Sequence, residues 1–178
     1  MNDFAQIDVP VGEDWYFEIV TGLLEYELIV ESGWNLLSVP IEPVDAAVAD
    51  LFGASIDGPA WEWNGLVEHY DEASSVHAKR AVWVHRGEAT STSVVVRGTV
   101  PSAAADWAAG WQMGGVVGGP PFSPVPRPLV TSPAGAVTAS LYRWNAAGGC
   151  YARLTGPIPC GIGVWLFLNQ AATVQLGQ

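Results

Sequence analysis

The stretch Gly33-Trp34-Asn35-Leu36-Leu37-Ser38-Val39-Pro40 decides how the chain is built, because its first residues return later in the sequence. Gly33-Trp34-Asn35-Leu36 corresponds to Gly110-Trp111-Gln112-Met113. Three further landmarks return in the same order and at nearly constant spacing: Trp63-Asn64 as Trp144-Asn145, Tyr70 as Tyr151, and Ala81-Val82-Trp83-Val84 as Gly163-Val164-Trp165-Leu166. Such self-similarity indicates a repeated structural unit. We predict two copies, over residues 31–100 and 101–178, preceded by an N-terminal strand extension over residues 1–30.

The residues between these landmarks favour β-strands. Trp61-Glu62-Trp63 alternates as a half-exposed strand does, and Asn64-Gly65 is a favoured hairpin-turn dipeptide. The return strand is expected over Leu66 to Tyr70. The segment from Ser91 to Arg97 is rich in β-branched residues, which suit a pleated sheet. We predict an all-β sandwich or barrel in which each copy contributes four or five strands.

One short helix is predicted over residues 43–52. Val44, Val48 and Leu51 lie at helical spacing, and Gly53 stands where a glycine commonly ends a helix. The matching stretch of the second copy, residues 119–128, is dense in proline, which the interior of a helix does not accept. The two copies are therefore expected to share strands and to differ on one face.

Charged residues are distributed unevenly along the chain. The net charge of −11 argues against nucleic acid and anionic membrane surfaces as partners. Residues 91–178 contain Asp106 as their only acidic residue, beside four arginines, whereas residues 1–90 contain all the other acids. A surface open to water normally carries more charge. The second copy is therefore either polar and neutral on its surface or covered by a partner.

No apolar run reaches the roughly 18 residues of a membrane-spanning helix, so we expect no membrane insertion. Residues 1–10 have no basic segment of the kind that opens a signal peptide. A mature chain would look the same, so this observation leaves the location open.

The repeated pattern resembles a β module that recurs in large secreted and cell-surface bacterial proteins. That module joins a Gly-Trp-Asn-Leu strand ending in Ser-x-Pro to a later aromatic strand like Ala81-Val82-Trp83-Val84. The similarity covers residues 28–98 well and residues 105–177 loosely, and it departs from the module at Gln112-Met113-Gly114-Gly115 and Lys79-Arg80. The resemblance implies an extracellular or cell-surface location and a structural or adhesive role. It supplies no catalytic residues.

Cys150 and Cys160 belong to the second copy alone. They bracket a strand, a turn and the start of another strand, across which the Cα separation of a disulfide can be met. We predict a disulfide between them, which favours an oxidising compartment. Two buried free thiols are the alternative.

The sequence carries no pattern that indicates catalysis, a cofactor or a metal ion. The histidines between residues 69 and 85 lack the spacing of a zinc site, and no Asp-x-Asp-x-Asp loop is present for calcium. Ser74 and Ser75 lie near histidines but in no Gly-x-Ser-x-Gly elbow. We predict a non-enzymatic protein without a cofactor or a bound metal.

We predict that the chain is a non-catalytic extracellular structural or assembly module. It would bind itself or another surface protein through the charge-poor second copy. The expected contact residues lie in the proline-rich loop: Phe122, Val125, Arg127 and Leu129. Replacing Val125 or Leu129 by Asp is expected to weaken self-association and to leave folding intact.

The alternative function is a carbohydrate-binding module that holds a polysaccharide on exposed tryptophans. Tryptophans that recur in both copies, such as Trp34 and Trp111, behave as the core residues of a repeat do. Trp15 and Trp107 have no counterpart, so they are the expected sugar-stacking residues.

Overall fold

The computed structural model describes residues 22–127 and 129–177, and its sheets are antiparallel throughout. The first half of the chain forms a three-stranded sheet of order β1-β7-β3 and a four-stranded sheet of order β2-β6-β4-β5. Their strands are β1 (Leu24–Val30), β2 (Gly33–Ser38), β3 (Glu42–Pro43), β4 (Ala60–Asn64), β5 (His69–Ala73), β6 (Ala81–Arg86) and β7 (Thr92–Thr99). The prediction of an all-β fold with one short helix is confirmed.

The second half forms sheets of order β8-β14-β10 and β9-β13-β11-β12. Their strands are β8 (Ala104–Trp107), β9 (Gly110–Gly114), β10 (Thr131–Ser132), β11 (Val137–Asn145), β12 (Cys150–Leu154), β13 (Val164–Leu168) and β14 (Ala172–Gln175). When β1 is matched to β8, the strand orders of the two halves correspond strand for strand. A duplicated unit predicts this correspondence, and the duplication itself stays a prediction.

Each half packs its two sheets around a core of its own. In the first half, β7 alternates buried and exposed residues, so that Val94 and Val96 point inward, against Val84 of β6. In the second half, Leu141 and Leu166 occupy the equivalent layer. Burying one such side chain stabilises the fold by about 1.5–3 kcal/mol relative to leaving it in water.

The helix α1 (Val48–Phe52) covers one side of the first core and is followed by the 3-10 turn η1 (Gly53–Ser55). It is shorter than the predicted 43–52 because Glu42–Pro43 pairs with β7 and is therefore extended. Leu51 and Phe52 are buried in the core. The helix ends at Gly53 as predicted, with a φ of 48° that favours glycine.

β1 is the edge strand of the first half and pairs with β7 along its whole length, from Leu24–Gly98 to Val30–Thr92. Residues 24–30 therefore belong to the first sandwich and are not an extension outside it. The first part of the predicted N-terminal extension, residues 1–21, lies outside the described residues.

The hairpin predicted at Asn64-Gly65 forms between β4 and β5, but its return strand begins at His69 instead of Leu66. Residues 65–68 make the turn, in which Glu68 adopts a positive φ of 54°. The longer turn leaves Leu66 largely exposed to solvent.

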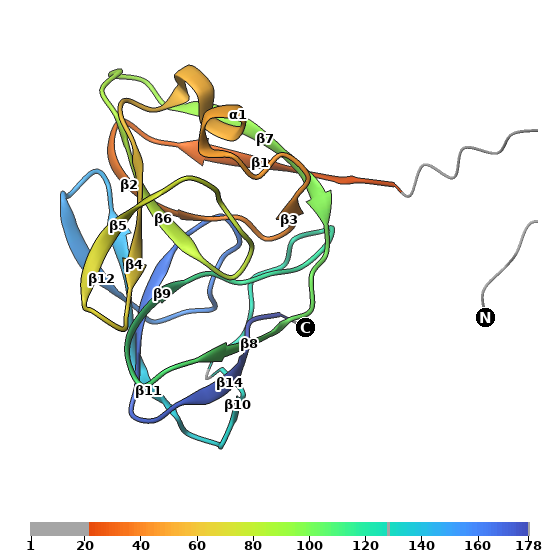
Figure 1. Cartoon of the computed structure of the whole chain (residues 1–178), viewed down its shortest axis with the longest axis vertical. Coiled ribbons are helices and arrows are strands. Elements are labelled where there is room, and N and C mark those ends of the chain that lie inside the picture. Colours follow the sequence, from red (N-terminus) through yellow and green to blue (C-terminus); the bar gives the residue numbers. More distant parts are fainter. Residues whose placement is uncertain (1–21, 128, 178) are drawn as a thin grey trace, which may run out of the picture.

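The two four-stranded sheets face each other and join the halves, and Figure 1 shows α1 toward one end of the molecule and the β8-β14-β10 sheet toward the other. Backbone bonds cross the junction at matched positions: Ser38 N donates to Gly161 O, and Gly115 N to Lys79 O, both at 3.2 Å. A Cβ on Gly163 would lie only 2.7 Å from Leu36 Cγ, so this approach needs glycine. In the described part of the chain, no helix has the length and apolar character to cross a membrane.

Candidate functional site

Aromatic side chains from both four-stranded sheets gather where the halves meet, and we call this set the aromatic junction. Its members are Trp34, Trp61, Trp63, Tyr70 and Trp83 of the first half and Trp111, Tyr142, Trp144, Tyr151 and Trp165 of the second. Four of them keep 41–47% of their surface exposed: Trp34, Tyr70, Trp111 and Tyr151. Contiguous exposed apolar surface is where interaction sites are commonly found, so this set is the candidate site.

Strand alternation explains how the sequence places these rings together. Trp61 and Trp63 are two residues apart on β4, so both point to the same face of the sheet. Register adds neighbours on that face, because Trp61 pairs with Trp83 and Trp63 pairs with Tyr70. In the second half, Tyr142 and Trp144 are arranged in the same way on β11.

Three rings make a first triangle. Trp144 and Tyr151, from the β11–β12 hairpin of the second half, pack on Trp83 of the first half. The ring centroids are 5.1 Å apart for Trp83–Trp144, 5.3 Å for Trp144–Tyr151 and 6.1 Å for Trp83–Tyr151. All three pairs meet edge to face, an arrangement that stabilises by about 0.5–1.5 kcal/mol a pair beyond area burial.

A second triangle mirrors the first with the halves exchanged. Trp63 and Tyr70, from the β4–β5 hairpin of the first half, pack on Trp165 of the second half. The centroid distances are 5.1 Å for Trp63–Trp165, 5.2 Å for Trp63–Tyr70 and 6.4 Å for Tyr70–Trp165. The aromatic rings of each half's hairpin thus pack on a central strand of the other half. The same reciprocal contact is found in an isologous interface between two subunits.

Two pockets open on these triangles, with volumes of about 320 and 440 Å³. The first aromatic pocket is lined by Trp34, Trp61, Tyr70, Trp83, Trp144 and Tyr151. The second aromatic pocket is lined by Trp63, Tyr70, Trp111, Tyr142, Tyr151 and Trp165. Both volumes lie in the range of roughly 300–1,000 Å³ that small-molecule sites occupy. Both pockets contain Tyr70 and Tyr151, so they are adjacent and form one continuous aromatic surface.

The outer ring of each pocket has a partner of different character. Trp34 of the first pocket meets the His85 imidazole with the centroids 5.1 Å apart, and His85 Nδ1 lies 3.8 Å from Asp57 Oδ2. At the matching place of the second pocket, Trp111 meets Phe167 at 5.4 Å. The first pocket therefore has a polar rim where the second has an apolar one.

Polar atoms within the aromatic junction are tied to one another. Trp165 Nε1 donates to the Tyr151 hydroxyl at 3.1 Å, and Trp63 Nε1 donates to Trp111 O at 2.9 Å. Burial, together with the nearby Tyr70, raises the pKa of Tyr151 to about 12, although the bond from Trp165 opposes part of that rise. The Tyr151 phenol is therefore neutral at physiological pH. Trp144 Nε1, in contrast, is buried with no acceptor among the described residues.

The tryptophans expected to stack on sugars are not the ones the structure exposes. Trp107 retains only 6% of its surface and packs in the second core, so its assignment as a sugar-stacking residue is wrong. Trp15 lies outside the described residues. Trp34 and Trp111, expected in the core, are the exposed members of the aromatic junction. Both are the second residue of their strand, at the periphery of the face, and this terminal position was the available signal.

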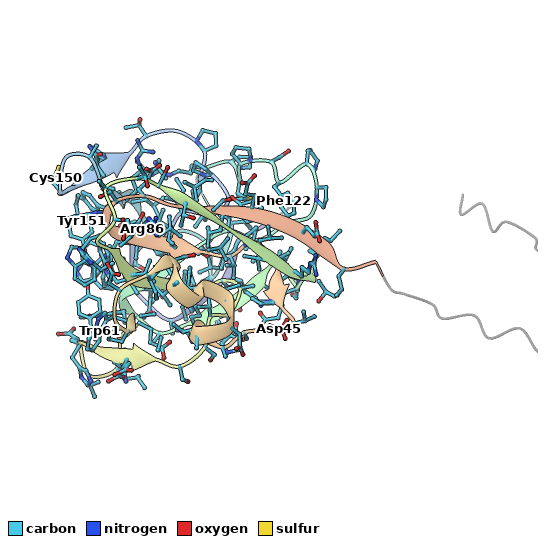
Figure 2. All side chains as sticks on the ribbon, turned by 90° about the horizontal axis from the view of Figure 1, so that it is seen from above. Asp45, Trp61, Arg86, Phe122, Cys150 and Tyr151 are labelled. Atoms are coloured by element: carbon cyan, nitrogen blue, oxygen red, sulfur yellow. The ribbon has the colours of Figure 1, made fainter. Side chains whose placement is uncertain are left out.

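The loop expected to mediate assembly contributes to the fold. Val125 and Leu129 are buried in the second core, so they offer no contact surface and that assignment is wrong. Phe122 packs edge to face on Tyr26, at 4.8 Å, and the Arg127 guanidinium donates to Leu154 O. Figure 2 shows Phe122 toward the side of the molecule opposite Trp61 and Tyr151, so this loop is remote from the aromatic junction.

Cys150 and Cys160 are free thiols, so the predicted disulfide is absent from the described residues. Cys150 is exposed at the start of β12, whereas Cys160 is half-buried and its Sγ lies 3.8 Å from Ser123 O. Burial raises the pKa of the Cys160 thiol, which lowers its reactivity.

A serine, a histidine and a glutamate form a hydrogen-bonded chain beside β3. Ser75 Oγ lies 3.0 Å from His77 Nε2, and His77 Nδ1 lies 2.7 Å from Glu42 Oε1. The order matches that of a hydrolase triad. However, the Val76 N–H, which would follow the nucleophile, is already bonded to Ala46 O and is not free for an oxyanion. Glu42 Oε2 also accepts a hydrogen bond from Ala78 N at 3.0 Å. We therefore assign these three hydrogen-bonded residues a structural role, in which they anchor the loop to β3.

The described residues contain no group of three or more His, Cys, Asp or Glu side chains placed to hold a metal ion. His69 and Asp71 do lie on one side of β5, and His69 Nε2 is 2.5 Å from Asp71 Oδ1. They form an exposed pair without a third ligand among the described residues. Hydrogen bonds from Asn64 and His69 lower the pKa of Asp71.

Comparison with known proteins found no match for this chain. No family model matches it, and neither a curated protein nor a solved structure is significantly similar. The resemblance to a secreted β module therefore stays a prediction.

Proposed function

We propose that the chain is a non-catalytic carbohydrate-binding module and that the aromatic junction is its binding surface. The observation that carries this proposal is the pair of exposed tryptophans, Trp34 and Trp111, each standing at the outer end of a pocket with an aromatic floor. The apolar C–H face of a sugar ring packs against an indole, while its hydroxyl groups stay at the polar rim. An aromatic floor with a few polar groups at its edge is typical of such a site.

The continuity of the surface favours a chain of sugars over a single sugar. The ring contacts run from Trp34 to Trp83, on to Tyr151, and then through its hydrogen bond to Trp165 and Trp111. A polysaccharide can therefore contact both pockets at once. Two weak stacking sites on one ligand act together, because binding at the second becomes intramolecular.

The extracellular or cell-surface location implied by the sequence resemblance belongs to this proposal, since polysaccharides are encountered there. The structural or assembly role also remains a hypothesis. Val125 and Leu129 are buried and cannot serve as its contact residues. An assembly contact would therefore use another surface, for which the aromatic junction is the candidate.

Titration of intrinsic tryptophan fluorescence against soluble polysaccharides tests the proposal, with calorimetry for any polysaccharide that binds. We expect saturable binding that Trp34→Ala and Trp111→Ala each weaken by about tenfold, in line with roughly 1–3 kcal/mol for an aromatic stacking contact. Val130→Ala is the matched control, because Val130 is an exposed apolar residue outside the aromatic junction.

Sedimentation of the same samples separates the two functions. Absence of binding across neutral and acidic polysaccharides would refute the proposal. Concentration-dependent oligomers that disappear in Trp34→Ala or Trp111→Ala would instead favour the assembly role.

A further inference from the structure

We propose that the second aromatic pocket is a subsite for an acidic sugar, whose carboxylate is recognised by Arg153, and that the first pocket does not accept one. This inference depends on the carbohydrate-binding function proposed above. It assigns a different sugar class to each of two pockets that are otherwise alike.

Arg153 lies beside the second pocket on the aromatic face of its sheet. It pairs directly with Tyr142, a wall of that pocket, and it is two residues from Tyr151 on β12. Directly opposed residues have their Cβ atoms about 4.5–5.5 Å apart and on the same face, and residues two apart on a strand also share a face. The Arg153 side chain therefore leaves β12 on the same face as the rings on which a sugar would stack, next to the residues that line the pocket.

The charge of Arg153 is uncompensated. It is exposed, and it forms no ion pair or hydrogen bond within residues 22–127 and 129–177. The strands of its sheet, β9, β11, β12 and β13, contain no Asp or Glu, and Arg143 is the only other charged residue on them. A carboxylate entering the second pocket thus meets no negative charge from this sheet.

The first pocket has the opposite character at the equivalent position. Glu72 pairs with Trp61 just as Arg153 pairs with Tyr142, and it is two residues from Tyr70 as Arg153 is from Tyr151. Asp57, beside His85, adds a further carboxylate at that rim. An acidic sugar would be repelled there, whereas the hydroxyl groups of a neutral sugar can donate to Glu72.

The chemistry of the two side chains identifies the ligand group. A guanidinium presents parallel N–H donors that match the two oxygens of a carboxylate, and it also packs flat against aromatic rings. A uronic acid combines a C–H face for the indole with a carboxylate at the ring edge. That combination matches Trp111 and Arg153 together, and no other described arginine lies beside an aromatic pocket in this way.

A matched pair of ligands tests the inference: a galacturonate hexamer and the same hexamer with its carboxylates methyl-esterified. We expect the intact protein to bind the acid form more tightly than the ester, and Arg153→Gln to weaken acid binding about fivefold without changing ester binding. This magnitude is that of a pair worth about 1 kcal/mol at an exposed site. Higher salt should reduce the preference for the acid form.

Three control variants make the result specific. Arg153→Lys should retain part of the preference, because it keeps the charge and loses the forked geometry. Arg143→Gln removes an arginine of the same sheet that does not share the aromatic face with Tyr142, and it should change neither affinity. Glu72→Gln should raise affinity for the acid hexamer, because it removes repulsion at the first pocket.

The outcomes distinguish the two proposals. Equal affinity for acid and ester, both weakened by Trp111→Ala and neither by Arg153→Gln, would overturn the acidic subsite and keep the carbohydrate function. No binding of either hexamer, or of any neutral polysaccharide, would overturn both. Loss of both affinities in Arg153→Gln without loss of fold would also refute the carboxylate assignment.

Discussion

Tyr70 and Tyr151 occupy corresponding places in the two hairpins, and each of them lines both aromatic pockets. Tyr151 packs on Trp83 and Trp144, and Tyr70 packs on Trp165 and Trp63. The boundary between the pockets is thus built from one tyrosine of each half. A change at either residue affects both pockets.

The raised pKa of Tyr151 predicts an alkaline loss of stability. Its pKa is about 12 in the folded protein, against about 10 in an unfolded chain. Between these values the folded state holds a proton that the unfolded state has released, so stability falls as pH rises from about 10 to 12 and is fully retained below 10. Tyr151→Phe should reduce this fall, measured by urea unfolding at pH 9 and pH 11. An identical fall in the variant would show that other groups, such as Tyr26, account for it.

The buried tryptophans of the aromatic junction should matter for stability more than the exposed ones. Trp165 retains 9% of its surface and Trp111 retains 42%. Trp165→Ala is expected to lower the free energy of unfolding by about 3–5 kcal/mol, the range for truncating a buried large aromatic residue. Trp111→Ala should cost clearly less. Chemical denaturation of both variants decides the matter, and equal losses would contradict the burial described.

Two matched tryptophans differ in how their indole N–H is bonded, and this difference predicts unequal costs of replacement by Phe. Trp63 Nε1 donates to Trp111 O, whereas Trp144 Nε1 is buried and has no acceptor within residues 22–127 and 129–177. Trp144→Phe removes an unsatisfied donor, and Trp63→Phe leaves an acceptor without its donor. We expect Trp144→Phe to be the less destabilising by about 1–2 kcal/mol. The reverse order in thermal or urea unfolding would show that Trp144 has an acceptor in solution.

Replacing Val125 by Asp is expected to impair folding and not association. It is buried in the second core and pairs with Ile158. Val125→Asp would place a carboxylate in that core, so we expect unfolding or a loss above about 3 kcal/mol. Val130→Asp, in the same loop but largely exposed, should stay within about 0.5 kcal/mol of the parent. Circular dichroism of the two variants gives the comparison.

The two cysteines should behave as independent thiols. Reductant is expected to leave the melting temperature unchanged, since no disulfide constrains the fold. A thiol reagent should label Cys150 faster than Cys160, because Cys150 is exposed while burial of Cys160 raises its pKa. A drop in melting temperature with reductant would show that the pair is oxidised in solution.

Strand positions and the end of the helix could be predicted from the sequence because they depend on local signals. Alternation identified β4, and Gly53 marked the end of α1. The extent of α1 could not be predicted in the same way, since Glu42–Pro43 is held extended by β7, a partner distant in the sequence.

The exposure of Trp34 and Trp111 could not be predicted from the sequence for a related reason. A period of two shows that Trp34 and Leu36 share one face of β2, but it does not show whether that face is covered at both positions. The covering sheet comes from the other half and buries Leu36 while leaving Trp34 at the margin. Likewise, a dense run of prolines indicates an extended loop but not that Val125 and Leu129 enter the core.

The reciprocal packing of each half's hairpin on the other half has a mechanical consequence. Since each aromatic pocket is lined by residues of both halves, a ligand bound there as proposed would hold the halves together. At a free ligand concentration 100 times the dissociation constant, such a ligand would add about 2.7 kcal/mol to the free energy of separating the halves. Conversely, a pulling force that separates the halves would disrupt both pockets together. A ligand bound in both would then dissociate in a single step.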